Sequence, residues 1–572
     1  MKKYTLYITL FVIVVLNIAS IFFHFRLDLT SEGRYTLSDN TKTLMKSLSK
    51  NDYQTEIIIY LDGDLNAGFI QLKKGMAELL DECQIYTKNK LTYRFVNPSE
   101  AKNDKERQKN YIALMSRGLE PKMVYEKDDE GRMIEKVVFP WAEIIQKNDT
   151  IPMLLLQDNP HLNGTEDLNH SIEGLEFALT DAIRVQQMKQ KQTIERVAFI
   201  EGHGELDSLY VISATESFAR YFQVDRGNLK FLYSQPEALD LYKAIIIAGP
   251  RTPFSEQEKF IIDQYIMRGG RVMWLVDGVK LAEDSLSTTG MSPSIALDVN
   301  LSDQLFKYGV RIVPALLQDM QCVQIPVNVS GNSTEPQYEP MPFYYSPLLL
   351  TSPEHAITKN LTEVKASFTS GVDLSVNSNE NIQKTILLAT SNASKIIAVP
   401  ERIDIRSMSE IDPQHHFNTG YLPVAAALEG KFSSVFTNRL IPDSIISTSK
   451  IIEQSVPTRM VVIANADIIR NSVIPTQQGL QIPPLGYDRY SNRIYGNKDF
   501  ILNSLLYLTD DEGWLNLRAR EFKLRLLNKK EIIEQKQRIQ FINVLLPIIS
   551  IILLGIIHFW RRKRKYGKVK KN

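Results

Sequence analysis

Two long apolar segments, one near each end, constrain this chain more than any other feature. Tyr4–Phe25 spans 22 residues and Phe541–Trp560 spans 20, each with few polar interruptions. Because a helix rises about 1.5 Å per residue, each segment is long enough to cross a hydrocarbon core of about 30 Å. The sequence therefore predicts two transmembrane helices that anchor an ectodomain of roughly 515 residues, and not a channel or a permease.

Basic residues beside the two segments predict their orientation. Lys2 and Lys3 precede the first, and Arg561–Lys565 are all basic and follow the second. The positive-inside rule then places both termini in the cytoplasm and the intervening chain outside. A cleaved signal peptide is the alternative for the first segment, but its apolar run exceeds the usual h-region and no A-x-A site follows it.

The charge balance and the two cysteines exclude some functions. Without the ten basic residues of the two tails, 57 basic side chains face 66 acidic ones, which argues against nucleic-acid binding. The basic tail is expected to set topology and to contact anionic lipid. Cys83 and Cys322 could pair in an oxidising compartment, but the helical pattern around Cys83 favours two unpaired core thiols.

Residues 28–190 are predicted to form an N-terminal α/β domain. After a connector with a helix cap near Ser38, strands and helices alternate in the order βαβα, then strands, then a helix, which is the thioredoxin-like order. The expected elements are the strand Glu56–Leu61, the helix Gly68–Lys88, the strand Leu91–Val96, the charged helical run Ser99–Gly118, the strands Lys122–Glu126, Met133–Phe139 and Ile151–Leu156, and the helix Asp167–Lys189.

Residues 191–510 are predicted to form a second α/β domain. Its apolar strands are continuous runs that alternate with helices, and this pattern indicates a doubly wound parallel sheet covered on both faces. Ser255 and Glu258 form a capping box at the start of a helix to Met267. Between about 290 and 445 the pattern weakens, and this stretch is interpreted as an insertion or a lobe on the sheet. The expected core strands are Arg196–Ile200, Ala244–Ala248, Arg271–Val276 and Arg459–Ala464.

The C-terminal part is predicted to be helical. Asn497–Tyr507 is an amphipathic helix, and Trp514–Gln540 is a long charged helix with one apolar face. The boundaries that follow are an N-terminal anchor at 1–27, a membrane-proximal stalk at 511–540, a second anchor at 541–560 and a basic tail at 561–572.

The strongest candidate for a binding site is the loop Glu201-Gly-His-Gly-Glu205. It follows a core strand, and ligands of doubly wound sheets bind beyond the carboxyl ends of the strands. Its glycines would let a ligand approach the backbone, and His203 with the carboxylates Glu201 and Glu205 could bind a metal or move protons. The alternative is that the glycines shape a tight turn and the charges cap a helix. Asp277 follows another core strand and is the fourth candidate.

Missing motifs argue against catalysis. The sequence lacks G-x-x-x-x-G-K-[ST], H-E-x-x-H and G-x-S-x-G, and it holds no C-x-x-C. The chain is therefore expected not to hydrolyse ATP itself, to need no metal or cofactor, and not to be an enzyme.

Several segments together resemble the gliding-motility family GldG of the Bacteroidetes. They are Val197–Leu206, Ala244–Asp277, Leu305–Arg311, Gly496–Asn503 and the connector Phe25–Leu44. The resemblance implies an inner-membrane auxiliary (substrate-binding) subunit of an ABC transporter, with a membrane permease and a separate cytoplasmic ATPase as partners. It also implies a glutamine-amidotransferase-like fold for the central domain. Asp277-Gly-Val follows Val276 where that fold would carry a nucleophile, so amidotransferase chemistry is not expected.

Three hypotheses remain open at this point. The first is a non-enzymatic transporter subunit that binds a substrate or an envelope partner. The second is a structural scaffold of a motility or secretion machine without a small ligand. The third is a periplasmic hydrolase that uses Glu201, His203 and Asp277.

Overall fold

The computed structural model describes most of the chain between Thr36 and Tyr566. The described residues are 11, 36–127, 132–147, 149–156, 164–191, 194–328, 337–377, 381–439, 451–477, 479–515 and 536–566. The chain divides into two compact units, Met1–Arg520 and Glu521–Asn572. The predicted anchor Tyr4–Phe25, apart from Phe11, and most of the predicted stalk Trp514–Gln540 lie outside the described residues.

The first part of unit 1 is built on a four-stranded sheet in the order β2-β1-β5-β6. β1 runs parallel to β2 and antiparallel to β5, which is antiparallel to β6. The strands and helices predicted for this part are present. The thioredoxin-like assignment concerned only the order of these elements along the chain, and for the fold of this part it stays a prediction. The elements are α2 (Asp39–Leu48), β1 (Thr55–Ile59), α3 (Ala67–Thr87), β2 (Leu91–Phe95), α4 (Asp104–Met115), β3 (Lys122–Lys127), β4 (Met133–Val138), β5 (Trp141–Gln146), β6 (Asp149–Leu154) and α5 (Gly164–Lys191).

Local sequence signals explain where these helices begin. The side chain of Ser38 accepts a hydrogen bond from the Thr41 amide at the start of α2, as the predicted cap requires. Asn66 does the same for α3. Cys83 lies buried on α3, and both Cys83 and Cys322 are free thiols, as predicted.

The central part of unit 1 is built on a ten-stranded sheet. Five parallel strands follow one another in the order β8-β7-β9-β10-β23, and β22, β19, β16 and β15 extend the sheet beyond β23. The parallel elements and the helices between them are β7 (Arg196–Glu201), η1 (Ser208–Val211), α6 (Ile212–Ala219), β8 (Gln223–Asn228), η2 (Leu229–Leu232), η3 (Pro236–Leu241), β9 (Ala244–Ala248), α7 (Glu256–Met267), β10 (Arg271–Leu275) and β23 (Thr458–Ile463).

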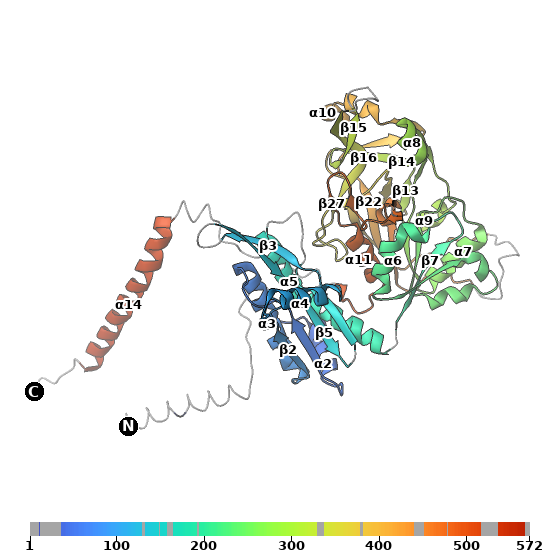
Figure 1. Ribbon diagram of the computed structural model, residues 1–572. Coiled ribbons are helices and arrows are strands. Elements are labelled where there is room, and N and C mark those ends of the chain that lie inside the picture. Colours follow the sequence, from blue (N-terminus) through green and yellow to red (C-terminus); the bar gives the residue numbers. More distant parts are fainter. Residues whose placement is uncertain are drawn as a thin grey trace, which may run out of the picture. The chain divides into compact units, whose positions relative to one another are not determined.

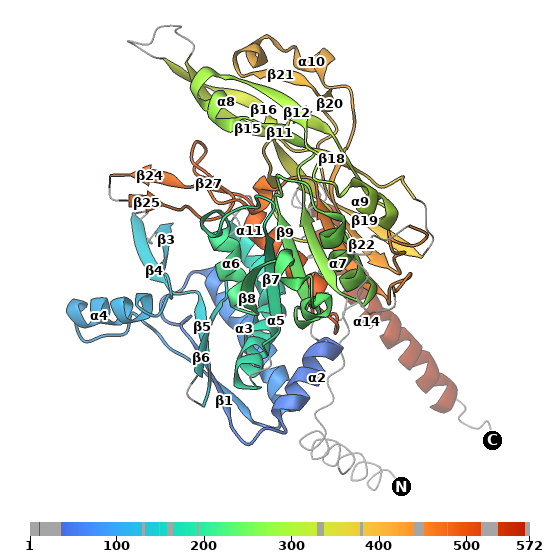
Figure 2. The same ribbon diagram turned by 90° about the vertical axis from the view of Figure 1, so that its right-hand side faces the viewer.

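Both faces of four parallel strands, β7, β9, β10 and β23, are buried, as predicted from their continuous apolar runs, whereas β8 is a polar edge strand. One face presents the row Phe199, Ile246, Met273 and Val461 to a cluster that includes side chains of α6 and of α11 (Asn497–Thr509). The other face presents Ile245, Val272 and Met460 to side chains of α7 and α9 (Ser302–Tyr308). Figure 2 shows β7 and β9 between α6 and α11 on one side and α7 and α9 on the other.

The prediction for 290–445, an insertion or a lobe on the sheet, did not include the strands that this stretch adds to the main sheet, and these strands make the sheet mixed. Strands β15, β16, β19 and β22 come from this stretch and join the main sheet, and β22 pairs antiparallel with β23. The 14-residue β16 contains three prolines, and proline is depleted in strands, so composition hides this strand. Figure 1 shows β16 and β22 in this part of the fold.

Smaller sheets and short helices complete the central part. The strands pair as β11-β12-β21, β13-β18, β14-β20, β24-β25 and β26-β27, and β17 pairs with β16. The elements are β11 (Val279–Leu281), α8 (Glu283–Thr289), β12 (Met291–Ala296), β13 (Arg311–Val313), β14 (Ala315–Asp319), β15 (Cys322–Asn328), β16 (Tyr338–Thr351), β17 (Val364–Lys365), β18 (Gly371–Asp373), β19 (Ile382–Ala389), β20 (Ser394–Ala398), β21 (Glu401–Asp404), η4 (Arg406–Glu410), α10 (Pro413–His416), β22 (Pro423–Gly430), η5 (Asp467–Ile469), β24 (Ile474–Thr476), β25 (Gly479–Gln481), β26 (Tyr487–Asp488) and β27 (Arg493–Ile494).

The two ends of the described part of unit 1 lie side by side. Asn40 Nδ2, in α2, is 3.4 Å from the carbonyl oxygens of both Glu512 and Gly513. Beside this contact, the guanidinium of Arg184 lies 5.3 Å from the ring centroid of Trp514. Asp511 forms ion pairs with Lys243 and Arg271 of the central part. The segment after α11 is therefore held by both parts of the unit.

Unit 2 contains one described helix, α14 (Lys536–Tyr566). Within it, Phe541–Arg564 is 24 residues long and apolar enough to cross a membrane by length and composition. This helix includes the predicted anchor at 541–560.

We expect Ile501→Ala to destabilise the central part by about 2–5 kcal/mol, because Ile501 is fully buried between α11 and the sheet. Chemical denaturation monitored by tryptophan fluorescence measures this loss. Lys498→Ala, at an exposed position of the same helix, is the control and should change the unfolding midpoint little. Equal effects of the two variants would contradict the packing of α11 described above.

Candidate functional site

The strand order of the central sheet predicts that a ligand would bind at the end where its parallel strands finish, which we call the carboxyl edge. Along the chain, β7, β8, β9, β10 and β23 occupy the spatial order 2-1-3-4-5, which reverses direction between β7 and β9. In parallel sheets with this order, ligands bind beyond the carboxyl ends of the strands near the point of reversal. The loops after β7, β9, β10 and β23 all lie at this edge.

The loop Glu201–Glu205 follows β7 and depends on its first glycine. Gly202 has φ of +122°, and a Cβ there would lie 2.4 Å from Nδ2 of Asn228. Both the backbone angle and the contact exclude a larger side chain. Gly202 therefore allows the chain to turn tightly against the end of β8.

His203, in the centre of this loop, is buried and held on three sides. Its ring stacks on Phe254 with 3.7 Å between the centroids. Nδ1 lies 3.2 Å from Oε1 of Glu205, and Nε2 lies 3.1 Å from Oε2 of Glu258. The His203 carbonyl accepts hydrogen bonds from the amides of Arg251 and Thr252. Both ring nitrogens thus have protein partners.

Glu258 has two roles. Its carboxylate completes the predicted capping box of α7 by accepting hydrogen bonds from the amide and the hydroxyl of Ser255, and the same Oε2 contacts His203. Burial tends to lower the pKa of His203, but the hydrogen bonds that its ring donates to the carboxylates of Glu205 and Glu258 outweigh this and raise the pKa above its usual value. Burial tends to raise the pKa of Glu258, but Ser255 and His203 together hold it below its usual range. Both shifts favour the charged forms of the two side chains.

The structure brings together two of the four predicted site residues. His203 and Glu205 are in contact, whereas Glu201 forms an ion pair with Arg226 and is partly exposed. Asp277 lies after β10, where it accepts a hydrogen bond from the Ala466 amide at 2.8 Å and pairs with Nη2 of Arg251 at 3.1 Å. Of these four residues, only Asp277 lines the cavity at this edge.

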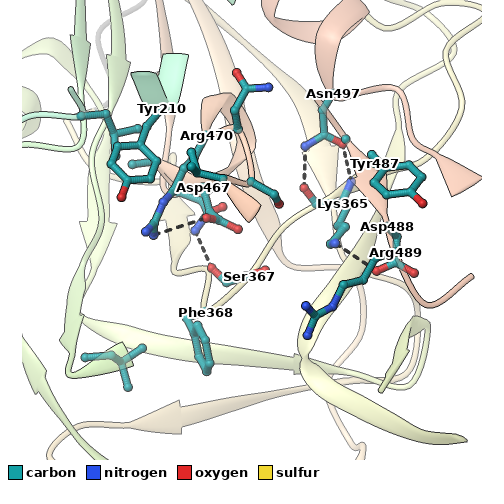
Figure 3. Close-up of a pocket in the computed structure, with 18 of the residues that line it drawn as sticks. Tyr210, Lys365, Ser367, Phe368, Asp467, Arg470, Tyr487, Asp488, Arg489 and Asn497 are labelled. Atoms are coloured by element: carbon teal, nitrogen blue, oxygen red, sulfur yellow. Dashed lines mark hydrogen bonds and ion pairs between the residues drawn. The ribbon is translucent and has the colours of Figure 1, made fainter. Parts of the chain in front are cut away.

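That cavity has a volume of about 610 Å³ and opens among the loops at the carboxyl edge of the sheet. Figure 3 shows part of its lining. Small-molecule sites in proteins are typically clefts of about 300–1,000 Å³ with a few polar groups in an apolar lining. Its charged lining residues are Arg251, Asp277, Lys365, Asp467, Arg470, Asp488 and Arg489.

Most of these charges are paired within the wall. Nζ of Lys365 lies 3.1 Å from Oδ1 of Asp488, and Nη1 of Arg470 lies 3.9 Å from Oδ1 of Asp467. Asn497 fixes the backbone of Lys365 with hydrogen bonds to its amide and its carbonyl. The wall is thus rigid and carries both signs of charge.

Sequence reasoning missed Lys365, Arg470, Asp488 and Arg489 as lining residues. Lys365 belongs to a two-residue strand, and the other three follow η5 on short hairpins or turns, where no periodic pattern marks them. Arg251 could have been found, because it follows β9 directly after Gly249-Pro250, as Asp277 follows β10. Among the described residues, no group of three or more His, Cys, Asp and Glu side chains is placed to hold a metal ion.

Comparison with known protein families now identifies the chain. Residues 195–504, more than half of the sequence, match the family model described as "ABC-type uncharacterized transport system". The chain belongs to this family. It is accordingly a transport-associated accessory protein of an ABC-type system, and its central sheet and cavity lie within the matched region.

The remaining comparisons add little. Residues 31–145 match a model described as a domain of unknown function, and no curated protein matches the chain. Among solved structures, the "mmIFT52 N-terminal domain" is 13% identical, with 56% of this chain and 99% of that chain covered and a TM-score of 0.31. A likeness this low supports no conclusion about this family member.

We expect His203→Gln to destabilise the central part by about 3–5 kcal/mol at pH 6, because it leaves two buried carboxylates without their cation. The pKa of His203 is raised in the folded state, so this contribution is complete below its unfolded pKa of about 6.5 and is lost as pH rises through the folded pKa. Denaturation of both proteins from pH 6 to 9 should show their difference shrinking. A constant difference would mean that His203 is neutral.

We expect Gly202→Ala to lower stability by about 1–3 kcal/mol, because alanine cannot adopt the backbone angle of Gly202 without strain. The matched control is Gly227→Ala in β8, where a Cβ would meet no atom within 4 Å. Thermal unfolding of the two variants compares them. If Gly227→Ala were the more damaging change, the tight turn at Gly202 would not be needed.

Proposed function

We propose that the chain is a non-enzymatic inner-membrane subunit of an ABC transporter, whose extracytoplasmic body offers a ligand pocket at the carboxyl edge of its central sheet. The family match over residues 195–504 carries this proposal. The permease and a separate cytoplasmic ATPase are its partners, since the sequence has no phosphate-binding loop of its own.

The membrane topology is part of the proposal. Helix α14 supports one anchor, because its segment Phe541–Arg564 is long and apolar enough to span a bilayer. Arg561–Arg564 at the end of this segment are basic and favour a cytoplasmic C-terminus. The second anchor, Tyr4–Phe25, rests on its apolar sequence alone. With both anchors in place, the bulk of the chain lies in the periplasm.

The absence of catalysis is supported by how the candidate residues are used. Both ring nitrogens of His203 contact carboxylates of the protein, and Glu201 pairs with Arg226. Glu201 and His203 do not line the cavity that Asp277 lines. A hydrolase that uses all three residues would need them at one surface.

The most specific part of the proposal is the role of the chain in the cell. The resemblance to GldG favours a transporter associated with gliding motility or envelope transport in the Bacteroidetes. The alternative is a structural scaffold of a motility or secretion machine without a small ligand. The cavity favours the first, because a scaffold has no need of a pocket of about 610 Å³.

A mild-detergent pull-down of the full-length chain from its own membranes, with mass spectrometry of the captured proteins, tests this function. We expect a permease and its ATPase to come with the chain. A variant whose 541–560 segment is replaced by an unrelated apolar helix is the control, and should lose the permease if the anchor docks on it. Capture of envelope or secretion components without a permease would favour the scaffold.

A further inference from the structure

The cavity at the carboxyl edge has an apolar part. Six apolar lining residues belong to one hydrophobic cluster, which packs between β11, α8, β16 and the loops beside them. The rings of Phe343 and Phe368 meet edge to face at 5.6 Å. A fully polar ligand would leave this surface in water, whereas an apolar group would remove it from water at a gain of about 25 cal/mol per Å². These six residues are Val279, Leu281, Leu286, Phe343, Phe368 and Ile405.

The charged part of the cavity wall has one more cation than it has carboxylates. The seven charged lining residues comprise four cations and three carboxylates. Arg489 is exposed and, in the described part of the chain, forms no ion pair; its guanidinium donates to the Tyr490 hydroxyl and lies 4.5 Å from the ring centroid. Arg489 therefore retains donors for an anion.

Two of the three carboxylates of the wall, Asp488 and Asp277, already have several partners. Asp488 accepts from Lys365 through Oδ1 and from the amide and hydroxyl of Ser491 through Oδ2. Asp277 accepts from the Ala466 amide and pairs with Arg251. A cationic ligand would have to compete with these bonds, whereas an anion finds a guanidinium with donors to share. The charges thus favour an anionic head group.

We propose that the cavity binds an amphipathic organic anion, with a carboxylate or phosphate head at Arg489 and an apolar body against the surface around Phe343 and Phe368. Arg489 lies beside the Lys365–Asp488 ion pair (Figure 3). Because Lys365 offsets the charge of Asp488, this pair repels an anionic head group less than a lone carboxylate would. The ligand class deepens the proposed function and rests on it for its biological meaning, since a transport accessory protein would present such a molecule to its permease.

A series of probes with one tail and different heads tests the class. The full-length chain in lipid nanodiscs is titrated by calorimetry with octanoate, octyl phosphate, octylammonium and acetate, and empty nanodiscs supply the background. We expect octanoate or octyl phosphate to bind at least tenfold more tightly than octylammonium, and acetate to bind at least tenfold more weakly than octanoate. The stronger of the two anions identifies the head.

Two variants with matched controls locate the binding. Arg489→Ala should weaken binding of the preferred anion about ten- to hundredfold, because it removes a charged hydrogen-bond donor, and Arg493→Ala, exposed on the next strand outside the cavity, should not. Leu281→Ser should weaken octanoate but leave acetate unchanged. Ile295→Ser, exposed on the adjacent strand β12 and outside this cavity, is its control.

Equal binding of octylammonium and octanoate, or unchanged binding by Arg489→Ala, would overturn the proposal. Binding that Arg493→Ala weakens as much as Arg489→Ala would also overturn it, since the effect would then be one of surface charge. The pull-down of the full chain reports separately on the transporter role. Anion binding without a captured permease would leave the pocket assignment standing and refute the proposed function, and a captured permease without anion binding would do the reverse.

Discussion

The need to satisfy and cover the backbone of the parallel strands determines most of the central fold. The four strands β7, β9, β10 and β23 are buried on both faces, so each face must carry helices, and α6 and α11 cover one while α7 and α9 cover the other. Along these four strands, only the ends stay open. Loops at the carboxyl ends of four strands surround the cavity, and any ligand of the sheet has to enter there.

His203 connects the loop after β7, at the carboxyl edge, to helix α7. Its ring contacts Glu205 of its own loop and Glu258, which also caps α7. A single carboxylate therefore links the end of β7 to the start of α7. The His203 carbonyl also accepts hydrogen bonds from the amides of Arg251 and Thr252, which join the loops after β7 and β9. His203 and Glu205, which the sequence presents as candidate site residues, thus support the loops beside the cavity.

Four of the five parallel strands, β7, β9, β10 and β23, were predictable because their signal is local. The fifth, β8, was missed because its sequence QVDRGN has no apolar run. Ala244–Ala248 is a run of five apolar residues, and the capping box at Ser255 marks the next helix. The antiparallel half was not predictable, because β16 contains three prolines and β22 reads as small residues whose burial depends on distant partners. The residues that line the cavity divide in the same way into predictable and unpredictable ones. Asp277 stands after a core strand and was found, whereas Lys365 and Arg489 reach the cavity only through the tertiary fold.

The contact between Asn40 and the segment after α11 has a mechanical consequence. Because Asn40 lies against Glu512 and Gly513, the continuous described part of unit 1 begins and ends close to this contact. A tension applied between its two ends would be borne first by this small contact and by the Asp511 ion pairs with Lys243 and Arg271. These would peel apart one after another, at low force, while the ten-stranded sheet stays out of the load path. The junction is therefore the weak link that would yield before the cavity changes shape.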